Sequence, residues 1–161
     1  MNKNITNNKI TILGAGISGI GAANLANYLG AKVLLSDKSK KINLNNKLSE
    51  SVTIELGGHS NKCFECDFAI VSPGINYNTN LIKRILKHKI PLISEIEFAS
   101  NFTNSTVISV TGSNGKSTTV SILEKIFKTK YINTLLGGNI GISFSHNVLN
   151  EIKNNLSNVI H

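Results

Sequence analysis

The chain has 161 residues, of which 40% are hydrophobic and 16% are charged. This composition fits one folded domain, or one domain with part of a second, and excludes a disordered polyelectrolyte. No apolar run reaches the roughly 18 to 20 residues that span a bilayer, and the polar start MNKNITNNKI does not resemble a secretory signal. We therefore expect a cytoplasmic protein with no membrane partner.

Lysine and arginine total 17 against 9 acidic residues, which gives a net charge of +8. Such an excess can indicate nucleic-acid binding. Here the basic residues are spread from Lys3 to Lys153, Arg84 is the only arginine, and no aromatic residues are interleaved to stack on bases. We therefore expect no nucleic-acid partner, while the charge remains compatible with a small anionic ligand.

Cys63 and Cys66 form a C-F-E-C pair, which can be a redox dithiol or half of a zinc site. A zinc site needs two further ligands, and the four histidines show no metal-ligand spacing. The simplest interpretation is two reduced thiols beside a strand.

The first part of the chain alternates apolar runs with helical patterns. Residues 10–13 form a short apolar run, residues 20–29 follow helical spacing up to Gly30, and residues 32–37 are expected as a second strand that ends in Asp37. Further elements are expected as strands at 52–56, 67–71 and 91–94, and as helices at 79–88 and 95–99. Strands that alternate with helices predict an α/β fold with a Rossmann-like parallel sheet.

The pattern restarts after the polar segment 101–105. It predicts a strand at 106–110, a glycine-rich turn, and a helix from Lys116 to about Thr129. We expect a Rossmann-like domain in residues 1–94 and the beginning of a P-loop-type ATPase domain in residues 95–161. One strand and one helix cannot close a doubly wound sheet, so the chain is interpreted as the N-terminal piece of a longer protein.

A first glycine-rich turn, Gly14-x-Gly16-x-x-Gly19, lies between the first expected strand and helix. Such glycines allow a tight turn and a close approach of the backbone to a phosphate at the helix N-terminus. Asp37 follows Gly19 by 18 residues, where an acid at the end of the second strand can meet a sugar hydroxyl. The motif predicts a nucleotide site and leaves NAD, FAD and other nucleotides open.

A second glycine-rich turn, TGSNGKST, spans residues 111–118. Its backbone N–H groups, the Lys116 ammonium and the Ser117 hydroxyl supply the donors and the Mg²⁺ ligand that a nucleotide phosphate needs. Val110 stands where the usual P-loop has its first glycine, so the match is to a shorter variant. Two weaker motifs, SPGI at 72–75 and GGNIG at 137–141, each indicate only a turn when taken alone.

Together these turns resemble the Mur ligase family, over residues 10–142, and are most similar to its D-glutamate-adding members. The L-alanine-adding members more typically have His in place of Asn114 and Thr in place of Ser117. The resemblance implies that the first domain binds the UDP part of the substrate through Ile17, Ser18, Asp37, Lys38 and Gly74, and that Asn139 contacts the muramoyl part between the two domains. It implies an ATP loop of Gly112, Ser113, Asn114, Gly115, Lys116, Ser117 and Thr118, in which Lys116 is catalytic and Ser117 is a metal ligand.

The resemblance also implies the reaction. ATP and Mg²⁺ would be the cofactors, UDP-N-acetylmuramoyl-L-alanine and D-glutamate the substrates, and an acyl phosphate the intermediate of an amide-forming ligation in peptidoglycan precursor synthesis. The enzyme is expected to be a monomer, and this chain alone is expected to be inactive. Two alternatives stay open: a non-catalytic fragment that binds a UDP-sugar, and an NAD-dependent oxidoreductase domain.

Overall fold

The computed structural model describes residues 4–42, 44, 48–131, 133–138 and 142–161. Its central feature is a parallel sheet of five strands in the order β3-β2-β1-β4-β5. The strands are β1 (Lys9–Leu13), β2 (Lys32–Asp37), β3 (Thr53–Leu56), β4 (Phe68–Val71) and β5 (Leu92–Ser94). This order reverses direction beside β1, as in Rossmann-like folds, and confirms the predicted fold class.

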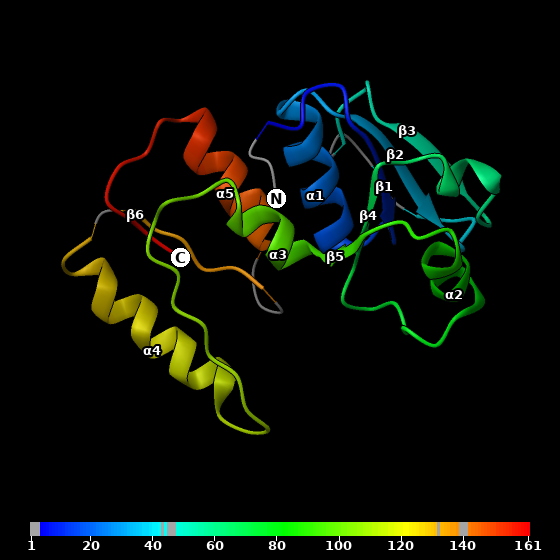
Figure 1. The fold of residues 1–161 in the computed structure, drawn as a ribbon. Helices are drawn as coiled ribbons and strands as arrows, with labels where there is room; N and C mark the ends of the chain where they lie inside the picture. Colours follow the sequence, from blue (N-terminus) through cyan, green and yellow to red (C-terminus); the bar gives the residue numbers. More distant parts are fainter. Residues whose placement is uncertain (1–3, 43, 45–47, 132, 139–141) are drawn as a thin grey trace.

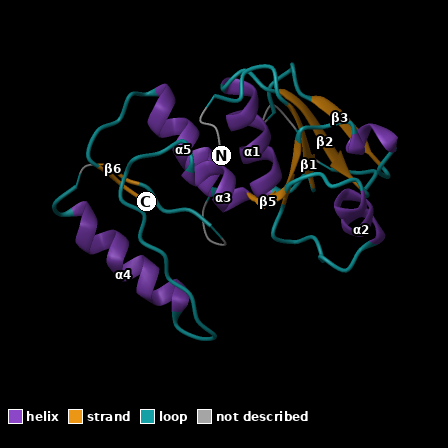
Figure 2. Cartoon of the chain, viewed as in Figure 1, coloured by secondary structure: helices purple, strands orange, loops and turns teal. Residues whose placement is uncertain are grey.

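Helices cover both faces of this sheet (Figures 1 and 2). The helices are α1 (Ile17–Tyr28), α2 (Asn80–Lys87), α3 (Glu95–Ser100), α4 (Lys116–Lys128) and α5 (Phe144–Lys153), with a short 3-10 helix η1 (Asn61–Phe64). α1 lies against one face of the sheet with α3 and α5 beside it, whereas α2 lies on the opposite side (Figure 1).

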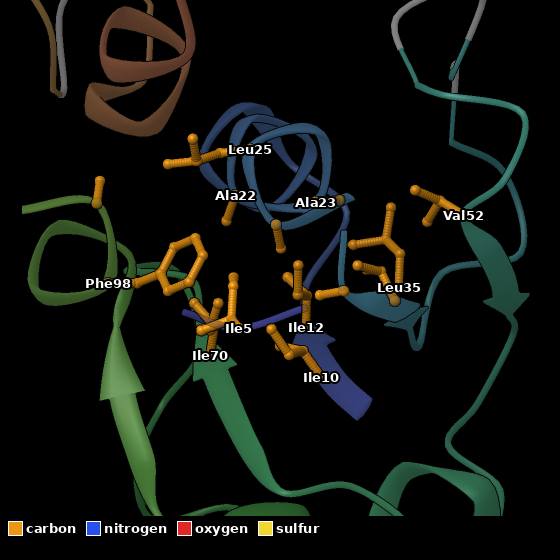
Figure 3. Close-up of a cluster of buried hydrophobic side chains, with 14 of the residues drawn as sticks. Ile5, Ile10, Ile12, Ala22, Ala23, Leu25, Leu35, Val52, Ile70 and Phe98 are labelled. Carbon is orange, nitrogen blue, oxygen red and sulfur yellow. The ribbon is translucent and has the colours of Figure 1, made fainter. Parts of the chain in front are cut away.

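The two faces of the sheet bury alternate residues of the same strands. Ile10, Ile12 and Ile70 point into the larger core beneath α1 and α3 (Figure 3). Leu13 and Val71 belong to the smaller core under α2. Because helices cover both sides of the sheet, a central strand is buried on both faces, which explains the continuous apolar sequence FAIV of β4.

Helix α1 reaches the sheet closely because its inner face is made of small residues. Ala22, Ala23 and Ala26 are buried without any exposed surface. The helix ends at Tyr28 and is followed by Gly30, whose φ of +86° favours glycine; the N–H of Ala31 then donates to the Ala26 carbonyl. This left-handed termination turns the chain directly into β2.

The part of the chain after α3 is less densely packed. None of the side chains of α4 is buried, and the helix extends away from the sheet (Figure 1). A two-stranded parallel sheet pairs β6 (Asn133–Thr134) with β7 (Val159–Ile160). The strand predicted at 106–110 is present only as a bridge from Thr106 to Ile160 with flanking backbone bonds to His161, because β7 offers a partner only two residues long.

A carboxylate on α5 connects three segments of this region. Glu151 accepts hydrogen bonds from Ser105 Oγ at 2.6 Å, Thr103 Oγ1 at 2.8 Å and His161 Nε2 at 2.7 Å. Burial alone raises the pKa of Glu151, but the hydrogen bonds from Ser105, His161 and Thr103 together outweigh it, so the pKa is lowered. The ionised form is therefore the one that the fold stabilises.

Because this pKa is lower in the folded state, the stabilisation by Glu151 is present above its unfolded pKa and is lost as the pH falls through its folded pKa. We expect Glu151→Gln to lower the melting temperature by roughly 3 to 6 °C at neutral pH. The difference between variant and wild type should shrink as the pH falls from about 5.5 to about 3, because the Glu151 carboxylate becomes protonated over this range. Thermal melts across this range check the prediction, and a constant difference would contradict it.

Candidate nucleotide sites

The first glycine-rich turn joins β1 to α1 and is packed too tightly for side chains at two of its glycines. Gly14 has a φ of +91°. A Cβ added to Gly19 would lie 1.8 Å from the Gly14 carbonyl oxygen, so only glycine allows the helix to begin this close to the strand. Ser72, at the end of β4, donates a hydrogen bond of 3.2 Å to the same carbonyl and fixes the turn from the neighbouring strand.

The outer side of this turn is open. A Cβ on Gly16 would meet no atom within 4 Å, and the Ile17 side chain is 67% exposed. Gly16 is the N-cap of α1 and has no side chain to cap it, so the first N–H groups of the helix point outward without intrahelical partners. Such a helix start favours an anionic group such as a diphosphate.

Asp37 lies at the end of β2, beside this turn. Its carboxylate accepts hydrogen bonds from the backbone N–H of Ala15 at 2.7 Å and of Ser39 at 2.8 Å. Asp37 thus holds the glycine-rich turn against the loop that carries the exposed Lys38. A carboxylate has further lone pairs, so it can still accept a hydrogen bond from a sugar or a base.

The SPGI turn completes the same edge of the sheet. Ser72 follows β4 directly, and the N–H of Ile75 donates to the Ser72 carbonyl at 3.0 Å. Gly74 has no atom within 4 Å of an added Cβ, so this position is also open. The structure therefore brings the predicted residues Ile17, Ser18, Asp37, Lys38 and Gly74 to the loops at the carboxyl ends of β1, β2 and β4, where open α/β sheets bind ligands. The sixth, Asn139, lies outside the described residues.

The second glycine-rich turn leads into α4. Gly112 and Gly115 have φ values of +146° and +77°, which side chains rarely adopt. Gly115 is the N-cap of α4, so the first N–H groups of a second helix are also left without a side-chain cap. The Lys116 ammonium folds back onto the loop and contacts the carbonyls of Gly112 and Ser113. The same geometry would place it against phosphate oxygens held by the loop.

Both turns open on one cavity of about 330 Å³. Ser18 and Pro73 line it from the first set of loops, and Lys116 and Ser117 line it from the second. Gly137 and Gly138, from the GGNIG motif, form another part of its wall. A ligand on the first turn and a phosphate on the second can therefore reach a common space.

A polar network lies next to Asp37, around Ser36 at the end of β2. Ser36 Oγ donates to Glu55 at 3.0 Å and lies 2.8 Å from His59 Nδ1, and Cys63 Sγ donates to Glu55 at 3.2 Å. Burial is the main reason why the pKa of the Cys63 thiol is raised to about 11, and the neighbouring carboxylate adds to it. Cys63 is thus a weak nucleophile, which disfavours a redox role. Among the described residues, no group of three or more His, Cys, Asp or Glu side chains could hold a metal ion.

Sequence reasoning missed the α5 contacts. It predicted no helix at 144–153, although two helix signals are present there. Ser143 is a typical N-cap residue, and the apolar residues Val148, Leu149 and Ile152 follow with helical spacing. It also gave no role to Glu95, a carboxylate that is buried at the start of α3 and lines the cavity. The burial of Glu95 cannot be predicted from the sequence, because its hydrogen-bond partner Ser145 lies fifty positions away along the chain.

The fold is a Rossmann-like α/β unit with a glycine-rich turn after β1, followed by a second glycine-rich turn at the start of α4. The chain belongs to the family described as "Mur ligase MurD-like, N-terminal domain", which matches residues 8–94. No helix among the described residues is long and apolar enough to cross a membrane.

Individual relatives agree with this family. The chain is 39% identical over 154 residues to a UDP-N-acetylmuramoylalanine–D-glutamate ligase of Elusimicrobium minutum, covering 90% of this chain and 33% of the relative. It is 42% identical over 146 residues to the enzyme of the same name from Bacteroides thetaiotaomicron, covering 89% and 33%. The solved pseudomurein peptide ligase type C of Methanothermus fervidus matches with a TM-score of 0.57 and 26% identity, covering 88% of this chain and 31% of that one. The chain thus spans about a third of the length of these relatives.

Proposed function

We propose that these residues are the N-terminal third of an ATP-dependent ligase that joins D-glutamate to UDP-N-acetylmuramoyl-L-alanine in peptidoglycan precursor synthesis. The observation that carries the proposal is the common cavity: two glycine-rich loops, each at an uncapped helix start, open on it in a chain of the MurD-like family. A ligase of this kind needs a nucleotide-linked acid and ATP side by side.

In this proposal residues 1–94 form the UDP-substrate domain. Ile17 and Ser18 bind the diphosphate, Asp37 and Lys38 flank the uridine, and Gly74 lies against it. Asn139 contacts the muramoyl part. The open backbone at Gly16 and Gly74 supports this assignment, since a ligand can approach there without displacing side chains.

Residues 95–161 begin the ATP domain. Gly112 to Thr118 cradle the phosphates, with Lys116 on the β- and γ-phosphates, and the Ser117 hydroxyl at the start of α4 suits Mg²⁺, which prefers oxygen ligands. When bound, Mg²⁺ neutralises charge on the phosphates. The substrate carboxylate attacks the γ-phosphorus and ADP leaves; the D-glutamate amine then attacks the acyl phosphate, phosphate leaves, and an amide remains. Lys116 stabilises charge that grows during the first transfer.

Because the chain spans only about a third of the length of its relatives, we propose that it binds the UDP-substrate but has no turnover alone. We also propose that the protein is a monomer in the cytoplasm. A non-catalytic fragment that binds a UDP-sugar remains the second candidate, since the first turn by itself supports binding only. An NAD-dependent oxidoreductase is disfavoured because it leaves the second phosphate loop without a role.

Isothermal titration separates these possibilities. UDP-N-acetylmuramoyl-L-alanine, ATP with Mg²⁺, and NAD would each be titrated into the purified chain. The proposal expects binding of the first two ligands and none of NAD. Binding of NAD without the UDP-substrate would contradict it, and binding of the UDP-substrate without ATP would favour the non-catalytic fragment.

Asp37 is expected to contribute to UDP-substrate affinity both directly and by holding the turn. Asp37→Ala should weaken binding by about 1 to 3 kcal/mol, the range for a hydrogen bond to a charged group. Asp37→Asn keeps one acceptor oxygen for the N–H of Ala15 or Ser39, so it should lose less affinity than Asp37→Ala. Titration of both variants with UDP-N-acetylmuramoyl-L-alanine checks the order, with Asp67→Ala, at the opposite end of the sheet, as control. Unchanged affinity in Asp37→Ala would refute the role.

A further inference from the structure

The first turn of α5 is held by a residue from another helix. Ser143, the N-cap, accepts a hydrogen bond from the N–H of His146 at 3.2 Å. Glu95, the first residue of α3, accepts one from the N–H of Ser145 at 2.6 Å through Oε1. The Ser145 N–H is one of the donors that a helix leaves without an intrahelical partner, and an anionic acceptor also interacts favourably with the helix dipole.

The same turn of α5 touches two glycines whose lack of a side chain is required. A Cβ on Gly21 of α1 would lie 2.0 Å from Ser143 Oγ. A Cβ on Gly137 would lie 2.6 Å from Asn147 Nδ2, and the N–H of Gly138 donates to the Ile142 carbonyl at 2.9 Å. The start of α5 therefore links the helix that follows the first glycine-rich turn to the cavity wall at Gly137 and Gly138.

Glu95 is an unusual residue for this position. It is 2% exposed, and burial raises its pKa despite the hydrogen bond from the Ser145 N–H. Burying a carboxylate is costly, and an apolar side chain could fill the space. Glu95 also lines the cavity together with Ser18, Pro73 and Gly137, so the residue that holds the start of α5 is itself part of the cavity wall.

From these contacts we infer that Glu95 is a positioning residue for the substrate: it fixes the start of α5, and through it Gly137 and Gly138, at a set distance from Ser18 and Pro73. This inference rests on the proposed function, in which the UDP part binds the first turn and the sugar-peptide part extends into the cavity. Glu95 should therefore affect recognition of the sugar-peptide part and leave recognition of UDP alone nearly unchanged.

The test compares two ligands on three variants. UDP and UDP-N-acetylmuramoyl-L-alanine would be titrated calorimetrically into the wild-type chain, Glu95→Ala and Glu95→Gln. Glu97→Ala serves as the matched control, because Glu97 is an exposed acid on the same helix. We expect Glu95→Ala to lose about tenfold in affinity for the sugar-peptide ligand and less than about twofold for UDP. Glu95→Gln, which keeps an acceptor oxygen, should restore affinity to within about threefold of the wild type.

Equal losses of affinity for both ligands would overturn the inference, because a general loss of stability affects both ligands alike. No loss of affinity for either ligand would also overturn it. If thermal melts show that Glu95→Ala does not fold, Ser145→Pro takes its place. It removes the N–H from which Glu95 accepts a hydrogen bond, together with the buried Ser145 hydroxyl, at a position in the first helical turn that tolerates proline. The same selective loss is expected. A wild-type chain that binds neither ligand would contradict the proposed function itself.

Discussion

Lys116→Ala is expected to lower the rate of ligation by about 10²- to 10⁴-fold in the ligase that carries these residues as its N-terminal third. Affinity for UDP-N-acetylmuramoyl-L-alanine should stay within about twofold. Lys116 lies at the start of α4, whereas the proposed uridine contacts lie on the loops after β1, β2 and β4. The effect should therefore fall on kcat and hardly on substrate binding.

The measurement is a steady-state assay of phosphate release that depends on D-glutamate, paired with titration of the UDP-substrate. Lys125→Ala is the matched control, because Lys125 lies in the last turn of the same helix, away from the phosphate loop. A Lys116→Ala enzyme with normal kcat, or one that loses only UDP-substrate affinity, would contradict the role assigned to this lysine.

Gly19→Ala is expected to destabilise the fold by about 3 kcal/mol, near the upper end of the usual cost of overpacking. The added methyl group would lie 1.8 Å from the Gly14 carbonyl oxygen, so the start of α1 would have to move away from the sheet. Because α1 packs on the sheet and also supports α3 and α5, the whole core on that side would be disturbed.

Gly16→Ala gives the matched comparison. Its methyl group would meet no atom within 4 Å, and the backbone there has an ordinary φ of −75°. We expect this variant to fold with wild-type stability and to bind the UDP-substrate more weakly, since the methyl group would occupy the open side of the turn. Urea unfolding of both variants tests the pair, and equal stability of the two would show that the turn is less constrained than the geometry indicates.

The sequence predicted the first half of the fold well because its signals are local. The apolar runs of β1, β2 and β4 and the spacing of α1 and α2 are visible without knowledge of their partners. The strand predicted at 106–110 depends instead on pairing with a distant segment, and Thr106 finds only the short β7. Strand formation is decided by such partners more than by intrinsic preference.

The candidate sites likewise contain some features that the sequence predicts and others that depend on the folded chain. The glycine-rich turns are visible in the sequence because glycines at this fixed spacing are typical of tight strand-to-helix turns. The structure places five of the six residues proposed to bind the UDP-substrate at one edge of the sheet. The hydrogen bonds of Asp37 to the turn could not be foreseen, because the same acid suits a ligand contact and a structural one. Glu95 was invisible for a related reason: only the folded chain brings Ser145 to it.

The central claim is that the two glycine-rich turns bind different ligands. Amide chemical shifts of the ¹⁵N-labelled chain, followed during titration, test it most directly. UDP-N-acetylmuramoyl-L-alanine should shift the amides of Ile17, Ser18 and Gly74 and leave those of Gly112 to Gly115 unchanged, whereas ATP with Mg²⁺ should do the reverse. If both ligands shift the same turn, or if the UDP-substrate shifts neither, the division of roles proposed for this chain is wrong.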